Sequence, residues 1–241
     1  MRLLMLDRLR RAIGAHDLPG LRGLLEAFVI CSYDRERVKE VGADRAAAEW
    51  IVRCEGKVKF DKLDDLFIDY NELIKKTAEL DPRKESDQVH VVSIDATDSS
   101  VTGYGCRHFG LFTALKRLLR REAATENRSF RLRGDCYARL FILAGLSHLK
   151  DVRFIRCRNL HDYGLDYMGD AVGKTLLFLQ IESCPRITEF GLENLVKFSG
   201  LRSLILHDLK RVHGKENVLK MLRKALPHCD VRYPEARLLG S

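Results

Sequence analysis

Two cysteines stand at matching places in this sequence, and cysteine side chains can hold a metal ion or attack a substrate. Cys184 follows a short alternating apolar run in "FLQIESCPRITEFGLENL" (178–195), and Cys157 has the same place in "DVRFIRCRNLHDYGLDYM" (151–168). A zinc ribbon needs C-x-x-C pairs, and a secreted disulfide framework needs an even number of cysteines. The seven cysteines here meet neither condition. We therefore expect no metal site and a reducing compartment.

Two other segments resemble catalytic motifs but fail on spacing or context. "MGDAVGKTLLF" (168–178) looks like a phosphate-binding loop, which needs G-x-x-x-x-G-K-[ST] after a buried strand. Only three residues separate Gly169 from Gly173, and the preceding segment is expected to be a helix. The pair His207-Asp208 lies in no triad pattern. The sequence thus predicts a protein that is not an enzyme and that uses no cofactor or small-molecule substrate.

The segments around the two cysteines are copies of one pattern. At an offset of 27 residues, six positions match: Phe154/Ile181, Cys157/Cys184, Leu160/Ile187, Asp162/Glu189, Gly164/Gly191 and Leu165/Leu192. A third, weaker copy lies 25 residues further on in "SLILHDLKRVHGKENVL" (203–219). A fourth, weaker copy is "VVSIDATDSSVTGYG" (91–105), with Ile94 and Thr97 at the apolar and cysteine positions. This period and the pattern L-x-L-x-x-C/N-x-x-L are typical of leucine-rich repeats.

Each such repeat predicts a strand of about five residues, a turn and a helix that packs behind the strand. The expected fold class is α/β: a short leucine-rich-repeat solenoid of the cysteine-containing type with an N-terminal helical cap domain. Cysteine at the strand-to-turn corner is then a small apolar filler. We expect Cys184 and Cys157 to be buried there and slow to react, with Cys184 in a structural role.

A helical cap is expected before the repeats. "DRERVKEVGADRAAAEWIVRCEG" (34–56) predicts a helix from about residue 44 to 54, with Asp44 as N-cap and Gly56 as the stop. Trp50, the one tryptophan of the chain, lies on the apolar face of this helix and is expected to anchor the core. "KVKF" (57–60) then reads as a short strand, and the polar stretch at 81–88 as a linker.

The strand pattern also predicts which side chains stand away from the helices and form a partner-binding surface. These are Ser93, Asp95, Ala96, Arg153, Ile155, Arg156, Gln180, Glu182, Ser183, Ile205, His207 and Asp208. The set is mixed in charge. A nucleic acid would need an unbroken basic stripe with stacking aromatic side chains, so this surface favours a protein partner.

Composition limits the class of protein further. With 241 residues, of which 46% are apolar, the chain can bury a real core, and no apolar run approaches the roughly 18 residues of a membrane span. The formal net charge is +8, which favours an acidic partner: nucleic acid, anionic lipid or an acidic protein face. The first residues, "MRLLMLDRLRRAIG" (1–14), read either as a mitochondrial targeting segment or as the start of an amphipathic helix.

Several of these segments together resemble a known family. They are "VGADRAAAEWIVRCEGKVKF" (41–60), "IDATDSSVTGYG" (94–105), "CRNLHDYGL" (157–165), "CPRITEFGLENL" (184–195) and "LHDLKRVHGKENVL" (206–219). They resemble the family of mitochondrial ATP synthase subunit s (coupling factor B) and distal membrane-arm assembly component 2, over about residues 20–233. The resemblance implies a peripheral protein on the matrix side of the inner membrane. It would act without catalysis on ATP synthase or respiratory complex I. The positive charge of the chain adds anionic lipid as an expected contact.

The chain departs from that family in two ways. The coupling factor B proteins carry Cys-x-Cys, a pair linked to redox sensitivity, where this chain reads "FIRCRNL" (154–160). Ile155 replaces the first thiol, so Cys157 is the one redox thiol that the resemblance implies. The second departure is the longer step from Ile94 to Phe154, which places an insertion at about 116–148. It is open whether this insertion is a degenerate repeat, a disordered segment or a retained intervening sequence.

The expected organisation is therefore a targeting segment (1–14), the cap (15–88), the repeats with their insertion (89–233) and a tail (234–241). A second class of function is open, because cysteine-containing leucine-rich repeats also occur in the substrate-recognition subunits of ubiquitin ligases. Such a subunit would need an F-box before the repeats. "HDLPGLRGLLEAF" (16–28) matches only its opening Leu-Pro, whereas "DRAAAEWIVRCEG" (44–56) favours the mitochondrial family.

Overall fold

One mixed sheet runs through the part of the chain that the computed structural model describes, residues 35–81, 84–103, 105–109 and 146–236. Its seven strands, in the order β2-β1-β3-β4-β5-β6-β7, are β1 (Lys57–Phe60), β2 (Leu66–Phe67), β3 (Val91–Asp95), β4 (Asp151–Ile155), β5 (Phe178–Glu182), β6 (Ser203–His207) and β7 (Asp230–Arg232). The α-helices are α3 (Arg35–Val41), α4 (Ala43–Arg53), α5 (Tyr70–Ala78), α8 (Asp162–Val172), α9 (Glu189–Glu193) and α10 (Lys215–Ala225). Short 3₁₀ helices are η1 (Glu85–Asp87), η2 (Gly105–Phe109), η3 (Asn194–Lys197) and η4 (Pro234–Ala236).

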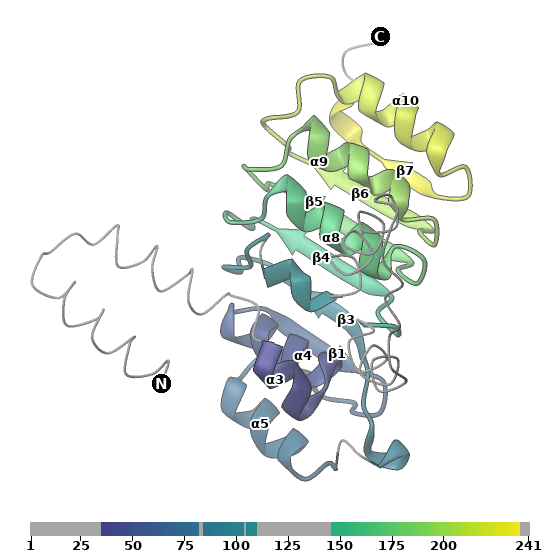
Figure 1. Ribbon diagram of the computed structural model, residues 1–241. Helices are drawn as coiled ribbons and strands as arrows, with labels where there is room; N and C mark the ends of the chain where they lie inside the picture. Colours follow the sequence, from purple (N-terminus) through teal and green to yellow (C-terminus); the bar gives the residue numbers. More distant parts are fainter. Residues whose placement is uncertain (1–34, 82–83, 104, 110–145, 237–241) are drawn as a thin grey trace, which may run out of the picture.

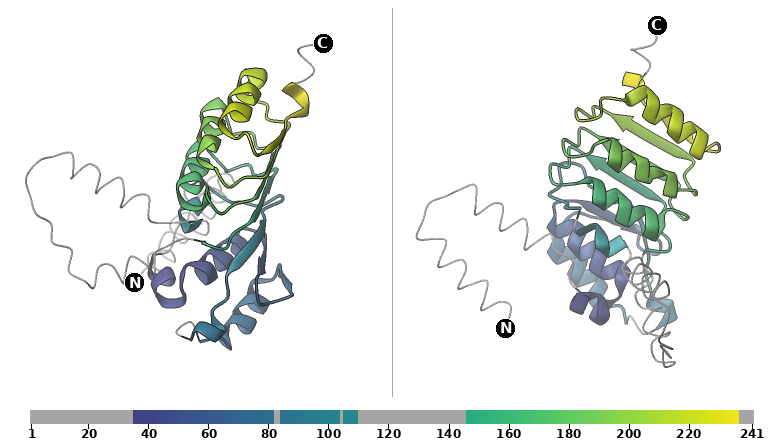
Figure 2. Two further views of the ribbon diagram at one scale, coloured as in Figure 1. Left: turned by 90° about the vertical axis from the view of Figure 1, so that its right-hand side faces the viewer. Right: turned by 45° about the horizontal axis from the view of Figure 1, so that its top comes forward.

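The two ends of the sheet are built differently. Strands β3 to β7 are parallel to one another, whereas β1 pairs antiparallel with both β2 and β3. Parallel neighbours need a crossover connection, and α8, α9 and α10 supply it between successive strands from β4 to β7. These helices and α4 cover one face of the sheet, and none of the described helices covers the other face, which we call the open face (Figures 1 and 2).

The strands of the repeated segments bury alternate side chains against the helices. The buried positions are Val152, Phe154, Leu179, Ile181, Leu204 and Leu206. The register places Phe154, Ile181 and Leu206 on one rung, so the predicted offsets of 27 and 25 residues are confirmed. Each strand, the corner after it and the following helix form one unit whose apolar side is covered by its neighbours.

The predicted alignment of the first copy is wrong by two residues. Ile94 pairs with Val152 rather than with Phe154, so Ala96 takes the inward apolar position. Ala96 is fully buried and cannot belong to the outward row in which the sequence placed it. Ser99, and not Thr97, then stands at the place of the cysteines. A slip of two residues preserves the inward–outward alternation of a strand, which is why the pattern alone did not exclude it.

The N-terminal part packs around α4. The helix predicted at 44–54 is α4, but its N-cap is Gly42, so the N-cap expected at Asp44 is wrong. Asp44 lies in the first turn, and its carboxylate accepts a hydrogen bond from the backbone N–H of Val91 at 2.8 Å, which ties the helix to β3. Trp50 is only 3% exposed, stacks on His108 at 5.1 Å and meets Phe109 edge-on. The strand predicted at 57–60 is β1.

Three predicted segments lie wholly or mostly outside the described residues. They are the targeting segment at 1–14, the insertion at 116–148, apart from its last three residues, and the tail at 234–241, apart from its first three. Within the described residues, none of the helices has both the length and the apolar character needed to cross a membrane.

Candidate functional site

The open face of the sheet is the surface on which most of the predicted partner-binding residues lie. Pairing across the strands forms one rung of Lys57, Asp95, Arg153, Gln180, Ile205 and Arg232, and a second of Ile155, Glu182 and His207. Ser93 lies on a third rung with Asp151, Phe178 and Ser203. The remaining three predicted residues, Arg156, Ser183 and Asp208, follow directly after the strands, at the corners.

Charges on the open face are largely held by neighbouring side chains. The guanidinium of Arg153 lies 5.4 Å from the ring centre of Phe178 and 3.7 Å from the carboxylate of Asp151. Gln180 donates to Glu182 at 3.1 Å. Among these polar groups, Ile155 and Ile205 are only partly buried. The face is therefore a mixed surface with an apolar component, and its geometry suits a protein partner better than a reaction.

The sequence pattern missed part of this face. Asp151, Phe178 and Ser203 lie two residues before predicted members of the set and face the same way, so extending the alternation would have found them. Lys57 and Lys59 reach the face by antiparallel pairing of β1 with β3. Repeat spacing carries no information on that pairing, so no signal in the sequence pointed to them.

Each parallel strand from β3 to β6 is followed by a residue in the left-handed backbone region. These residues are Asp98, Arg156, Ser183 and Asp208, with φ of 57°, 57°, 50° and 47°. Non-glycine residues rarely adopt this conformation. It is held here by a recurring hydrogen bond, because the N–H of Asp98 donates to Ile155 O, that of Arg156 to Glu182 O and that of Ser183 to His207 O. The first three corners are thus fixed by the next strand.

The last of these corners is closed by a side chain. The N–H of Asp208 donates to the Oε1 atom of Glu235 at 2.7 Å, where the earlier corners use a backbone carbonyl. Glu235 also pairs with His207. Burial raises the pKa of Glu235, but the N–H of Asp208 and neighbouring groups lower it more, so it lies below its ordinary value. An ionised Glu235 therefore replaces the carbonyl of a further strand.

The two aligned thiols lie one residue after the corners and are fully buried. Cys157 donates to the carbonyl of Ala96 at 2.9 Å and has Ser99 Oγ at 3.5 Å, while Cys184 lies 3.5 Å from the carbonyl of Phe154. The adjacent Cys184 thiol and burial raise the pKa of Cys157 far above its ordinary value. The thiolate is the reactive form, and the raised pKa keeps Cys157 protonated. Because the thiol is also buried, an oxidant or electrophile would reach it only after local opening.

The acidic residues that open α8 and α9 each stabilise the start of the next helix. Asp162, at the start of α8, accepts from the backbone N–H and hydroxyl of Thr188, the N-cap of α9. Glu189, at the start of α9, accepts from the N–H groups of His213 and Gly214 before α10, and these bonds hold the pKa of Glu189 below its ordinary value. The unpaired N–H groups of a helix start are thereby satisfied by the preceding unit.

The segment that resembles a phosphate-binding loop is a packing element. Gly169 lies inside α8, and Gly173 is its C-cap, where the helix dipole disfavours an anion. A Cβ on Gly173 would overlap the carbonyl oxygens of Gly169 and Lys197, so glycine is required for the close approach of η3. Within the ranges that the structure describes, no three His, Cys, Asp or Glu side chains are grouped so that they could hold a metal ion.

The positive charge of the chain is distributed unevenly. Basic and acidic side chains are equal in number over the described residues, so the formal charge of +8 is carried by residues outside them. Net charge therefore gives no reason to expect an acidic partner for the open face as a whole. Only local groupings of charge can do so.

Comparison with known proteins gives one consistent match. No family model matches the chain. The curated protein "ATP synthase subunit s, mitochondrial" from Rattus norvegicus is 29% identical over 201 residues, which cover 83% of this chain and 80% of that protein. The proteins of the same name from Homo sapiens and Bos taurus are 28% and 26% identical over the same shares. The resemblance seen in the separate sequence segments is thus confirmed along most of the chain.

Proposed function

We propose that this protein is a non-catalytic accessory factor of mitochondrial ATP synthase. The observation that carries the proposal is the similarity to ATP synthase subunit s over 83% of the chain, which includes both the region around α4 and the repeated units. An F-box protein would share only the repeats with such relatives. The ubiquitin-ligase function is therefore the weaker alternative. Complex I is the second partner that the family resemblance implies.

The proposal includes a domain division and a fold family. The strand–corner–helix units from β3 to β7 are taken as leucine-rich repeats of the cysteine-containing type, which the 27- and 25-residue register and the buried corner cysteines support. Residues 15–88 are taken as the cap and 89–233 as the repeat domain. The protein would lie on the matrix side of the inner membrane as a peripheral component, in contact with anionic lipid as well as protein.

Within this function, the open face is the surface that binds the protein partner. Its rungs combine partly buried Ile155 and Ile205 with charged groups that are held in place by neighbours, such as Arg153. Interfaces between proteins are typically built from such preorganised mixed surfaces, with apolar side chains in the middle and polar ones at the rim. The corner residues Arg156, Ser183 and Asp208 would form that rim.

Affinity purification tests the partner. Tagged full-length protein is isolated from detergent-solubilised mitochondria, and the proteins that accompany it are identified. Enrichment of ATP synthase subunits over complex I subunits is expected. Preferential recovery of complex I would replace ATP synthase in the proposal. Recovery of ubiquitin-ligase subunits from a cytosolic fraction would overturn the mitochondrial function altogether.

Two matched variants test the surface. In the first, Arg153, Arg156, Glu182 and His207 on the open face and its corners are changed to Ala. In the control, Glu193, Asn217, Lys220 and Arg223, which are exposed on the helix side, are changed to Ala with the same change in net charge. The open-face variant should lose its partner in the purification and the control should keep it. Retention of the partner by both would assign binding to another surface.

A further inference from the structure

The edge of the sheet at which the parallel strands end carries exposed basic side chains that form no salt bridge with the described residues. Arg158 follows the corner of β4, Arg186 follows that of β5, and Lys210 and Arg211 follow that of β6. All four are exposed. Arg158, Lys210 and Arg211 form no salt bridge with any residue that the structure describes. We refer to these four residues as the basic edge.

Acidic side chains near this edge are already occupied. Asp98 forms a bidentate salt bridge with Arg156, with N···O distances of 2.5 and 2.6 Å. Asp162 accepts hydrogen bonds from Thr188. Glu189 accepts from two backbone N–H groups at the start of α10. Hydrogen bonds to N–H groups leave the negative charge of a carboxylate in place, so these acids offset part of the positive charge of the edge, but none of them forms a salt bridge with the four cations.

Arg186 is held at the edge by an uncharged partner. Its Nη1 atom lies 2.7 Å from Nε2 of His161, which can accept that hydrogen bond only when the imidazole is neutral. Burial lowers the pKa of His161, and the nearby Arg186 and Arg211 lower it further, which favours the neutral ring. The His161 ring in turn stacks on Tyr163 at 5.2 Å. Arg186 is therefore held in place by a neutral acceptor, and it forms no salt bridge with a described acid.

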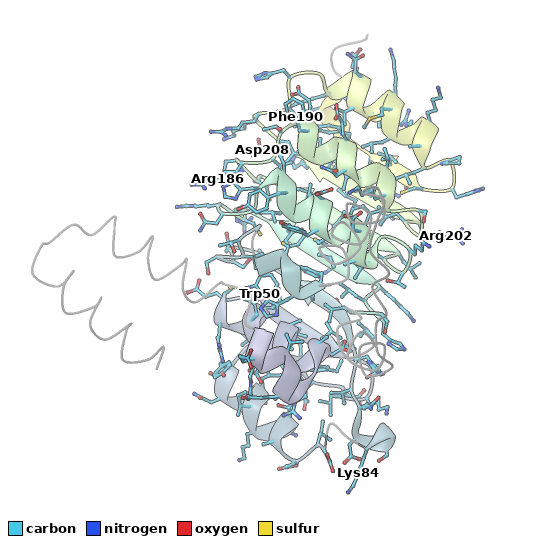
Figure 3. The ribbon with its side chains drawn as sticks, in the orientation of Figure 1. Trp50, Lys84, Arg186, Phe190, Arg202 and Asp208 are labelled. Carbon is cyan, nitrogen blue, oxygen red and sulfur yellow. The ribbon has the colours of Figure 1, made fainter. Side chains whose placement is uncertain are left out.

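Two aromatic side chains are exposed beside these cations. Tyr163 and Phe190 occupy the second positions of α8 and α9, and they are 44% and 72% exposed. Figure 3 shows Arg186, Phe190 and Asp208 on one side of the molecule and Arg202 on the opposite side. Exposed aromatic rings next to Lys and Arg are the combination that anchors proteins at the headgroup level of a membrane.

We propose that the basic edge, together with Tyr163 and Phe190, docks on a membrane surface that contains anionic lipid. Successive strands lie about 4.8 Å apart, so the corners form a row that a flat surface can meet along its length. Anionic headgroups complement the four cations. The proposal takes from the proposed function only the location at the inner membrane, and it names the surface that makes the lipid contact.

An acidic protein would complement the same charges but fits the apolar part less well. Strong protein–protein contacts bury aromatic anchors in a packed centre surrounded by other contacts. Among the described residues, Tyr163 and Phe190 are the large apolar side chains that are well exposed at this edge. A lipid headgroup layer accepts a single projecting ring without a matching pocket. The edge also lies to the side of the open face, so lipid and protein contacts can be made together (Figure 2).

Vesicle binding by the full-length protein tests the proposal. The probes are phosphatidylcholine vesicles with and without phosphatidylglycerol, and the measurement is the fraction of protein that sediments with them. The edge variant is Arg158→Gln, Arg186→Gln, Lys210→Gln and Arg211→Gln. The matched control, Lys150→Gln, Lys174→Gln, Arg202→Gln and Lys224→Gln, removes the same charge from exposed positions on the opposite side, where the strands begin and the helices end. Basic residues outside the described ranges are identical in both.

The edge variant should lose affinity for the anionic vesicles, by about fivefold for each residue that contacts the surface, and the control should stay within about twofold of the native protein. Phe190→Ser should weaken binding in its own right without removing charge. Equal losses in both charge variants, or no loss in the edge variant, would overturn the proposal. If the edge variant instead binds vesicles normally but loses ATP synthase in detergent, the edge binds an acidic protein. Since that purification is free of bilayers, failure of the vesicle test leaves the proposed function standing.

Discussion

Residues 35–109 and residues 146–236 share one sheet but are stabilised in different ways. The first region joins its elements by a few large contacts between residues far apart in sequence: Trp50 on His108 and Phe109, and the buried Glu49 with Arg37. The second region repeats small contacts at each step, namely a corner hydrogen bond and a carboxylate at the next helix start. Acidic residues are in excess in the first region and basic residues in the second.

This difference predicts how each region responds to substitution. Loss of a large contact removes support from several elements at once, whereas loss of a repeated contact weakens one boundary between two units. The first region should therefore be the more sensitive to single changes. The following substitutions test that expectation in order of decreasing effect.

Trp50→Ala should have the largest effect. Removing a buried large aromatic costs about 3 to 5 kcal/mol, because it deletes apolar contacts and leaves a cavity. Urea unfolding measures the loss, and amide hydrogen exchange should locate it in α4, β1 and η2. Trp50→Phe is the control and should recover part of the stability. A change below about 1 kcal/mol would mean that the first region does not depend on this contact.

Glu49→Gln should cost about 2 kcal/mol, since hydrogen bonds to charged groups contribute about 1.5 to 3 kcal/mol. The carboxylate is 2% exposed and lies 2.7 and 2.8 Å from two nitrogens of Arg37. Asp65→Asn is the matched control, because Asp65 pairs with Lys76 where both side chains are exposed, and it should cost less than about 0.5 kcal/mol. Equal losses of unfolding free energy in the two variants, measured by thermal or urea unfolding, would show that burial does not strengthen the Glu49–Arg37 pair.

Asp162→Ala should cost about 1 kcal/mol, the usual loss when the group that satisfies a helix start is removed. Hydrogen exchange should increase at the start of α9, in the next unit, more than in α8 itself. Faster exchange confined to α8 would show that the carboxylate stabilises its own helix. Measured with the Trp50 variant, this substitution sharpens the contrast between a single large contact and a repeated small one.

Glu189→Gln tests the equivalent contact at the start of α10 through its dependence on pH. The folded-state pKa of Glu189 lies below the ordinary 4.5, because the N–H groups of Gly214 and His213 bind the ionised form. A depressed folded pKa contributes stability that is present above the ordinary value and is lost as pH falls through the folded one. The native protein should therefore exceed the variant in stability above about pH 5, and the difference should shrink in more acidic buffer. A difference independent of pH would indicate a purely steric effect.

Arg156→Gly should have the smallest effect. Glycine removes a left-handed strain of about 1 kcal/mol but increases the freedom of the unfolded chain by about the same amount. The exposed pair with Asp98 that is lost contributes little. We expect a change within about 0.5 kcal/mol in urea unfolding. A loss above about 1 kcal/mol would show that the Arg156 side chain, rather than the corner backbone, stabilises this position.

Much of the repeated region could be predicted from spacing alone. The 27-residue match around Cys157 and Cys184 gave the register of β4 and β5, because buried positions must recur when identical units stack. The register of β3 was wrong by two residues, since alternation is unchanged by such a slip. Antiparallel β1 could not be placed, and its lysines on the open face were missed, because no repeat relates it to its neighbour.

The backbone corners were also out of reach of the sequence. Left-handed conformation is ordinarily signalled by glycine, asparagine or aspartate, and Arg156 and Ser183 give no such signal. The conformation of Arg156 and Ser183 is imposed by hydrogen bonds to the next strand, which exist only after the units have stacked. The basic edge was not recognised for a related reason: only the fold shows that the acids close to it in sequence form no salt bridge with its four cations.

A stack of like units resembles a one-dimensional crystal, which can grow wherever its end layer offers unpaired donors to another layer. β7 is the edge strand of the sheet, but it ends at Arg232 and does not reach the corner after β6. The donor at that corner is already saturated, because the carboxylate of Glu235 lies where the carbonyl of a longer edge strand would be. A second molecule that approached this corner would have to displace a charged acceptor before it could pair. Glu235 therefore blocks pairing at this one corner, where the short edge strand leaves the end of β6 uncovered.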